Sequence, residues 1–222
     1  MLIGDEILMF ITVIKALAYE YLCLIFFCVI FQIIMAVEEN KNGHKYEWKH
    51  FAWVYIFFIY LMLVFICTGT GNIHEFTRYK GMSETITRLT EINLVPFSST
   101  SGGIVTHAAN SVMFMPFGFL LPFIWRQFRS SLKVACTGLF FSLAIELSQL
   151  LNMRATDIDD LIMNTLGAFL GWMVFYLFKN KDRKPIDSSN RTKLSFPARH
   201  EAFFYLVLSF TDVFLLYNPF LF

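Results

Sequence analysis

Six long apolar stretches constrain the fold of this 222-residue chain more than any other feature. They run over residues 16–37, 51–70, 104–125, 132–151, 161–178 and 203–222. A bilayer has a hydrocarbon core about 30 Å thick, which a helix of about 20 apolar residues can cross. The composition agrees, because 56% of the residues are hydrophobic and only 16% are charged. We therefore predict an all-α polytopic transmembrane helical bundle of about six spans, forming one membrane domain over residues 1–222.

Lys and Arg are distributed unevenly among the connecting segments. The segments 38–50, 126–133 and 179–202 contain thirteen of them, whereas 71–103 and 152–160 contain four. Cytoplasmic loops of membrane proteins are enriched in Lys and Arg, so we expect the N-terminus to lie outside. The net charge of +1 gives no indication of a nucleic-acid partner. The four cysteines lie inside apolar stretches without metal-ligand spacing, so we expect no metal and no cofactor.

Two stripes of polar residues lie at neighbouring ends of the fourth and fifth stretches. At about 100° per residue, five residues of the fifth stretch share one helical face, while Asp159 points elsewhere. These five are Asp157, Asp160, Asn164, Gly167 and Gly171. The stripe on the fourth stretch consists of Ser142, Glu146 and Gln149. A short connection makes the two helices antiparallel neighbours, so the stripes are expected to face each other.

Glu146 has two interpretations. A carboxylate inside a span costs about 2.5–3.5 kcal/mol on insertion scales, and such residues usually face the bundle interior or a wet cavity. Arg154 is the nearest candidate partner in sequence, with Asp157 and Asp160 competing for it. The cluster could be a set of ion pairs that pins two helices together, with the glycines permitting close packing. It could instead be an extracytoplasmic polar pocket.

The third stretch supports the pocket. Asn110 is the one strongly polar side chain between His107 and Arg126, and it lies near the depth expected for Glu146 and Asn164. Asn110 could form an interhelical hydrogen bond or contact a ligand, and the sequence favours neither interpretation. His107 is expected to be an interfacial residue. The segment 93–103 upstream could be a lid over the outer mouth or an ordinary surface loop.

Three motifs resemble the VanZ-like family of bacterial membrane proteins. They are "NLVPF" (93–97), "NSVMFMPFG" (110–118) and "IELSQLLNMRATDIDDLIMNTLGAFLG" (145–171), and the resemblance covers about 93–178. The stretches at 16–37 and 203–222 are then additions to this core. The family motifs correspond here to Asn93, Pro96, Phe97, Asn110, Phe114, Pro116, Gly118, Glu146, Gln149, Asp157, Asp160, Asn164, Gly167 and Gly171.

The resemblance implies a multi-pass protein of the bacterial cytoplasmic membrane, related to a founding member associated with resistance to teicoplanin-type glycopeptides. We expect a binding site made of Asn93, Asn110, Glu146, Gln149, Arg154, Asp157, Asp160 and Asn164. Its partners would be membrane lipid and a lipid-linked cell-wall precursor or a lipoglycopeptide. An intramembrane enzyme with Glu146 as acid or base is the alternative. A transporter is the weakest hypothesis, because no inverted repeat is visible.

Overall fold

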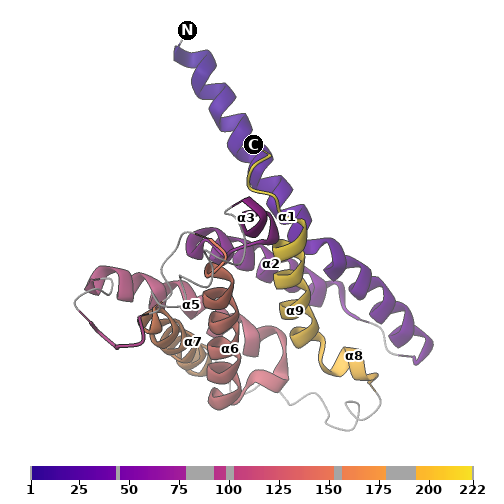
Figure 1. The fold of residues 1–222 in the computed structure, drawn as a ribbon. Helices are drawn as coiled ribbons and strands as arrows, with labels where there is room; N and C mark the ends of the chain where they lie inside the picture. The colour runs from indigo at the N-terminus through magenta and orange to yellow at the C-terminus, as the bar shows by residue number, and fades with distance from the viewer. Residues whose placement is uncertain are drawn as a thin grey trace.

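The computed structural model describes residues 2–43, 46–78, 93–98, 103–152, 157–178 and 194–221. These residues form helices, with no strand among them (Figure 1). In chain order the helices are α1 (Leu2–Lys41), α2 (Trp48–Thr68), α3 (Ile73–Arg78), α5 (Ile104–Ile124), the 3-10 helix η2 (Arg126–Phe128), α6 (Ser131–Gln149), α7 (Ile158–Phe178), α8 (Phe196–Arg199) and α9 (Glu201–Leu216).

Five segments are long and apolar enough to cross a membrane, which confirms the predicted all-α polytopic bundle. They are Leu8–Lys41, Trp48–Glu75, Ile104–Ile124, Ser131–Gln149 and Ile158–Phe178. The sixth predicted span, 203–222, is corrected to α9, which has 16 residues and ends at Leu216. At 1.5 Å per residue α9 is about 24 Å long, less than the hydrocarbon thickness. Asn218 and Pro219 follow this end, and Pro219 has no N–H to continue a helix.

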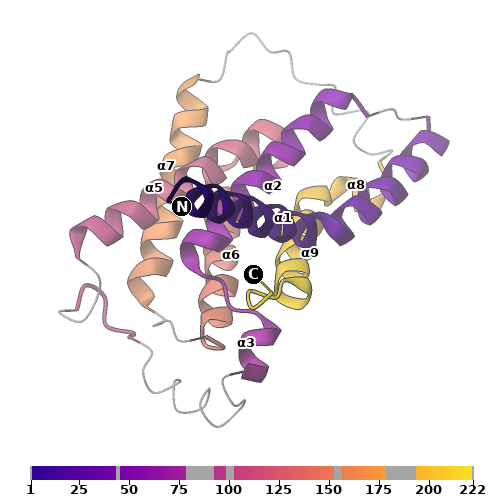
Figure 2. The same ribbon diagram turned by 90° about the horizontal axis from the view of Figure 1, so that it is seen from above.

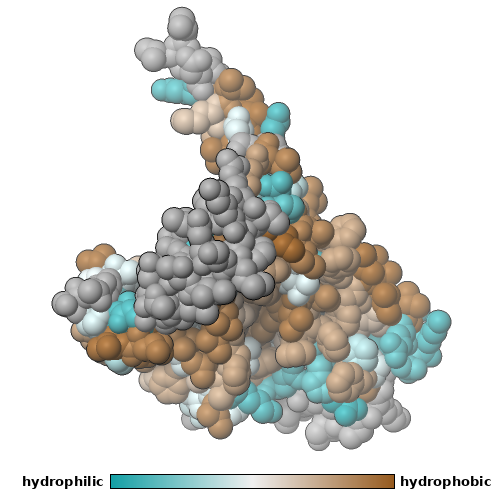
Figure 3. Space-filling model, in the orientation of Figure 1, coloured by the Kyte–Doolittle hydropathy of each residue, from teal (hydrophilic) through white to brown (hydrophobic). Residues whose placement is uncertain are grey.

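The first predicted span, 16–37, lies inside a much longer helix. α1 has 40 residues, so it is about 60 Å long, roughly twice the hydrocarbon thickness. Its N-terminal part extends away from the other helices (Figure 1), and Leu8, Met9 and Phe10 are exposed there. The apolar residues before position 16 therefore continue the helix. In the space-filling view, apolar side chains cover much of the surface of the visible face (Figure 3).

The helices form two groups with α2 between them. α5 packs mainly on α7, α6 packs on α7, and α1 packs on α9 (Figures 1 and 2). Aromatic side chains of α2 contact both groups. The ring of Phe57 lies 6.1 Å from that of Phe117 on α5, and the ring of Phe58 lies 5.2 Å from that of Tyr205 on α9. All four side chains are fully buried, so this aromatic core joins the two groups.

Glycines bring α5 and α7 into close contact. A Cβ atom added to Gly167 would lie 2.1 Å from the carbonyl oxygen of Ser111, and one added to Gly171 would lie 1.9 Å from that of Met115. Real Cβ atoms do not approach an oxygen so closely. The glycines are expected to permit close packing of the fourth and fifth stretches, but the structure places them against α5, the third stretch. This contact fixes the N-terminal end of α5 beside the first turns of α7.

Candidate acidic site at the end of three helices

The segment 93–98 is fastened to the beginning of α7. Asn93 and Asp157 form an isolated parallel bridge, in which the N–H of Ile158 donates to the carbonyl oxygen of Asn93 at 3.0 Å. The Asn93 amide Nδ2 donates to Ser98 Oγ at 2.8 Å and to Asp157 Oδ2 at 3.3 Å. Residues 93–98 therefore lie against the acidic stretch, which favours the lid interpretation over an ordinary surface loop.

Asp157 and Asp159 organise this junction with their carboxylates. Asp157 Oδ1 accepts the N–H of Asp159 at 3.0 Å, which caps the first turn of α7. Asp159 accepts the N–H of Phe97 at 2.9 and 3.0 Å through its two oxygens. Phe97 has a φ of 54°, a left-handed conformation that is costly for a residue with a Cβ. The carboxylate of Asp159 therefore stabilises a strained turn.

His107, which the sequence predicts to be an interfacial residue, lies beside the same cluster. Its Nε2 lies 3.9 Å from Asp159 Oδ2, and its ring meets that of Phe97 edge to face at 5.7 Å. The side chain is 13% exposed. Asp159 itself is fully buried, and its carboxylate contacts Phe97 and His107. Its partners come from a loop and from α5, which helical periodicity does not reveal.

Asn110 and Asp160 connect α5 with α7. The amide Nδ2 of Asn110 donates to Asp160 Oδ1, and both side chains are half-buried. The structure therefore shows the interhelical hydrogen bond that was one of the two predictions for Asn110. The other oxygen of Asp160 has room for a second donor, since a carboxylate can accept up to about four hydrogen bonds.

The two predicted stripes of α6 and α7 face each other. Glu146 is 4% exposed, and its Oε2 accepts the N–H of Asp157 at 3.4 Å. About two turns along α7 from Asp157, Asn164 Nδ2 donates to Ser142 Oγ at 2.9 Å. Glu146, Asp157 and Asn93 thus form one connected series at this end of α6 and α7, with the Asn164–Ser142 pair beneath it.

The predicted site residue Gln149 falls outside this cluster. Gln149 Nε2 donates to the carbonyl oxygen of Thr68 at 2.7 Å, so this side chain holds the end of α2. Nearby, Ser148 Oγ accepts the N–H of Gly71, and Asn152 Nδ2 donates to the carbonyl oxygen of Gly69. Arg154 lies outside the described residues.

The cluster is strongly acidic and has unused polar atoms. Four carboxylates gather at the ends of α6 and α7, together with the amides of Asn93 and Asn110 and the imidazole of His107. The carboxylates are those of Glu146, Asp157, Asp159 and Asp160. In the described part of the chain, His107 Nδ1 and Asn164 Oδ1 are buried without a hydrogen-bond partner. Buried polar atoms are nearly always paired, so such atoms need an explanation, for example an ordered water or a ligand. Among these residues no three side chains are arranged to hold one metal ion.

Exposed apolar side chains surround the acidic cluster. Leu94, Val95 and Phe97 of the loop are 69%, 64% and 63% exposed, and Ile104 and Val105 at the start of α5 are 86% and 82% exposed. An acidic, amide-bearing site with an apolar rim can bind hydrogen-bond donors or a cationic group on a molecule that also carries a lipid. The protein is therefore a polytopic helical membrane protein with a polar site at one end of three spans.

Comparison with known proteins identifies the class further. The chain belongs to the VanZ-like family, since a model of the VanZ/LLP1 family matches residues 57–179, more than half of its length. It is similar to Protein VanZ from Enterococcus faecium, with 37% identity over 98 residues. That alignment covers 43% of this chain and 60% of the relative. No solved structure matches. The matched region contains α5, α6 and α7 and therefore the whole acidic cluster.

Proposed function

We propose that this protein lowers the susceptibility of a bacterial cell to teicoplanin-type lipoglycopeptides. Membership of the VanZ-like family supports this function, because the family's founding member is associated with such resistance. Its place of action would be the cytoplasmic membrane, with the acidic cluster facing outward. The thirteen-to-four distribution of Lys and Arg supports that orientation.

The proposed mechanism is binding at the acidic cluster. The observation that carries it is the group of four carboxylates with two buried, unpaired polar atoms beside them. Asp160 and Glu146 would accept hydrogen bonds from hydroxyl, amide or ammonium groups of a lipid-linked cell-wall precursor. The exposed side chains of Leu94, Val95 and Ile104 would contact its lipid, or the lipid tail of the drug. Either contact would reduce the action of the drug at the membrane surface.

Drug susceptibility tests the proposal. Expression of the wild-type chain in a susceptible Gram-positive host should raise the inhibitory concentration of teicoplanin more than that of a glycopeptide without a lipid tail. Asp160→Asn should abolish this protection at unchanged membrane abundance. Glu38→Gln is the matched control, because it also neutralises a carboxylate, at an exposed position on α1. Full protection by Asp160→Asn would refute the site, and no protection by the wild-type chain would refute the function.

An enzymatic role for Glu146 is the second candidate. Burial of this carboxylate inside the bundle, 3.4 Å from the N–H of Asp157, is an environment in which a carboxyl group can exchange a proton. Incubation of the purified protein with a lipid-linked cell-wall precursor distinguishes the two mechanisms. A product that accumulates with time and is lost in Glu146→Gln would replace binding with catalysis, whereas retention of unchanged precursor supports binding.

A further inference from the structure

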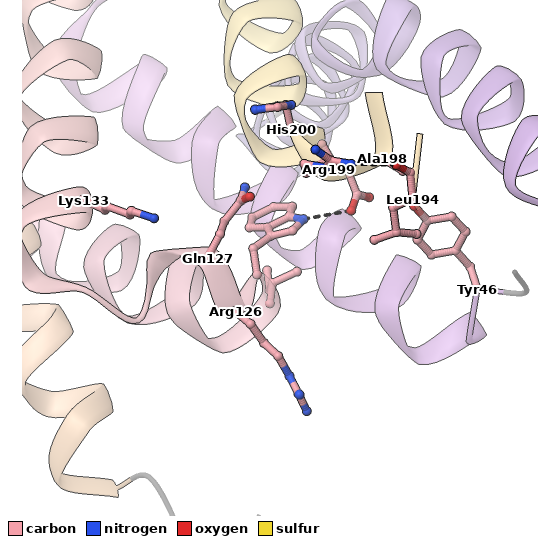
Figure 4. A pocket seen from close by; sticks show the side chains of 11 residues that line it. Tyr46, Arg126, Gln127, Lys133, Leu194, Ala198, Arg199 and His200 are labelled. Carbon is pink, nitrogen blue, oxygen red and sulfur yellow. Dashed lines mark hydrogen bonds between the residues drawn. The ribbon is translucent and has the colours of Figure 1, made fainter. Parts of the chain in front are cut away.

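A cavity lies at the opposite end of the bundle from the acidic site. Its volume is about 760 Å³, and it lies where η2, the start of α6 and the junction of α8 with α9 meet (Figure 4). Lys133, Arg199 and His200 are among the residues that line it, together with apolar side chains such as Ile124 and Leu194. The cavity is therefore basic on some sides and apolar on others.

Among the described residues that line this cavity, the carboxylate of Glu201 is engaged in hydrogen bonds. Both oxygens of Glu201 lie within hydrogen-bond distance of His50 Nε2, at 2.9 and 3.0 Å. Oε2 also accepts the indole N–H of Trp125 at 3.0 Å (Figure 4). Burial raises the pKa of the Tyr46 phenol, so this lining residue stays neutral and adds no negative charge. The lining is consequently cationic.

Lys133 and Arg199 are two of the three Lys and Arg side chains that line the cavity, and the third, Arg126, extends away from them (Figure 4). Lys133 is exposed in the first turn of α6, and its side chain extends toward Gln127 across the cavity (Figure 4). A cation at this end of a helix is disfavoured by the helix dipole, and a bound anion would offset that effect. Arg199 uses one nitrogen, Nη2, to donate to the carbonyl oxygen of Leu194 at 3.3 Å. Its remaining donors can bind an anion.

An apolar groove of about 300 Å³ lies between α6 and α9. On α6 it is lined by Thr137, Phe140 and Ala144, which follow Lys133 at helical spacings of four, three and four residues. On α9 it is lined by Phe203 and Val207, which are four residues apart. Residues at such spacings share a helical face, so Lys133 lies on the face of α6 that lines the groove. Arg199 is the last residue of α8, and His200 separates it from α9.

We propose that an anionic phospholipid occupies this combined site. Its phosphate would bind Lys133 and Arg199, and an acyl chain would lie in the groove between α6 and α9. A free phosphate would use only the basic part and leave the groove without an occupant. In the predicted orientation the lipid belongs to the cytoplasmic leaflet, where basic pockets between spans bind anionic headgroups. α8 and α9 lie outside the residues matched by the family, so this site is separate from the acidic one.

Lipid retention by the purified full chain tests the proposal. The protein is washed in neutral detergent, incubated with vesicles of phosphatidylglycerol or phosphatidylcholine, or with inorganic phosphate, and the bound molecules are measured by native mass spectrometry. Phosphatidylglycerol should be retained in preference to phosphatidylcholine, and inorganic phosphate should not be retained. Each basic residue near an anionic surface contributes about 1 kcal/mol, so the double variant Lys133→Gln/Arg199→Gln should retain phosphatidylglycerol about thirtyfold less.

Two further variants separate this site from nonspecific contacts. Lys41→Gln/Lys49→Gln removes two exposed charges from the same end of the molecule but outside the cavity, and should leave retention unchanged. Val207→Trp should fill the groove and also reduce phosphatidylglycerol binding while the basic residues remain. Equal losses in both lysine-containing double variants would show a nonspecific charge effect and overturn the proposal. The proposal that a lipid occupies the site would be refuted if Val207→Trp left phosphatidylglycerol binding unchanged. It would also be refuted if the protein retained inorganic phosphate.

Discussion

At the scale of single residues, Asp159 explains why the loop before α5 has its conformation. A non-glycine residue with positive φ costs of order 1–3 kcal/mol, and Phe97 has this conformation directly after Pro96. The two hydrogen bonds from Phe97 N to the Asp159 carboxylate offset that cost. The Phe97 ring then lies against His107. The "NLVPF" motif is thus a turn whose shape depends on an acid 62 residues later in the chain.

Asp159→Asn should therefore lower the free energy of unfolding by about 1–3 kcal/mol, because it weakens hydrogen bonds to a buried charged group. Thermal unfolding in detergent measures this change. The exposed carboxylate of Glu38 provides the control, and Glu38→Gln should change stability by less than about 0.5 kcal/mol. Equal stability of Asp159→Asn and the wild-type chain would show that the turn does not need the carboxylate.

Glu146 allows the two interpretations of the acidic stripes to be separated. If Glu146 binds or transforms a ligand, Glu146→Gln should leave the protein at normal abundance and remove protection against teicoplanin. If it is half of a buried ion pair with Arg154, removing one partner costs about 3–5 kcal/mol, and the protein should disappear from the membrane. Immunoblots of membranes and inhibitory concentrations for Glu146→Gln, Arg154→Gln and the double variant decide the matter. Rescue by the double variant would identify a structural pair.

At the scale of helices, the acidic site depends on how closely α5 approaches α7. Asn110 on α5 meets Asp160 on α7 only because Gly167 and Gly171 place no side chain between the helices. Any Cβ at these positions would collide with backbone oxygens, which cannot rotate away. The glycines therefore determine the geometry of the site without belonging to it.

Gly167→Ala and Gly171→Ala should each destabilise the protein by about 1–3 kcal/mol, the usual cost of overpacking a tight contact. They should also reduce teicoplanin protection, because α5 would move away from Asp160. Gly103→Ala is the matched control, since nothing lies within 4 Å of a Cβ at that position. Thermal unfolding of all three variants gives the comparison. Wild-type stability in Gly167→Ala would mean that the two helices are not in such close contact.

The helices also show which features of the fold follow from the sequence. Apolar stretches and helical periodicity predicted the five spans, the facing stripes and the interhelical contact of Asn110, together with a sixth span that is the shorter helix α9. Periodicity did not reveal Phe97 as the partner of Asp159, because Phe97 lies in a loop, and it failed for Gln149, because Thr68 lies at the end of a helix distant in sequence. Hydropathy alone overestimated the length of α9 and underestimated the length of α1.

At the scale of the whole molecule, the two ends of the bundle differ in charge. Glu146, Asp157, Asp159 and Asp160 gather at one end, whereas Lys133 and Arg199 line the cavity at the other. Cytoplasmic segments of membrane proteins are enriched in Lys and Arg. In the proposed orientation the acidic site faces the outer surface, where cell-wall precursors are used, and the basic cavity faces the anionic lipids of the inner leaflet.

Cysteine accessibility in intact cells checks this orientation. In a background carrying Cys67→Ala and Cys136→Ala, the remaining native cysteines are buried. Val95→Cys should then react with a membrane-impermeant maleimide, because Val95 is 64% exposed beside the acidic site. Asn42→Cys, exposed at the opposite end after α1, should react only after the cells are permeabilised. The reverse pattern would place the acidic site in the cytoplasm. It would then be unable to engage an extracellular drug, and the basic cavity would have to bind a lipid of the outer leaflet.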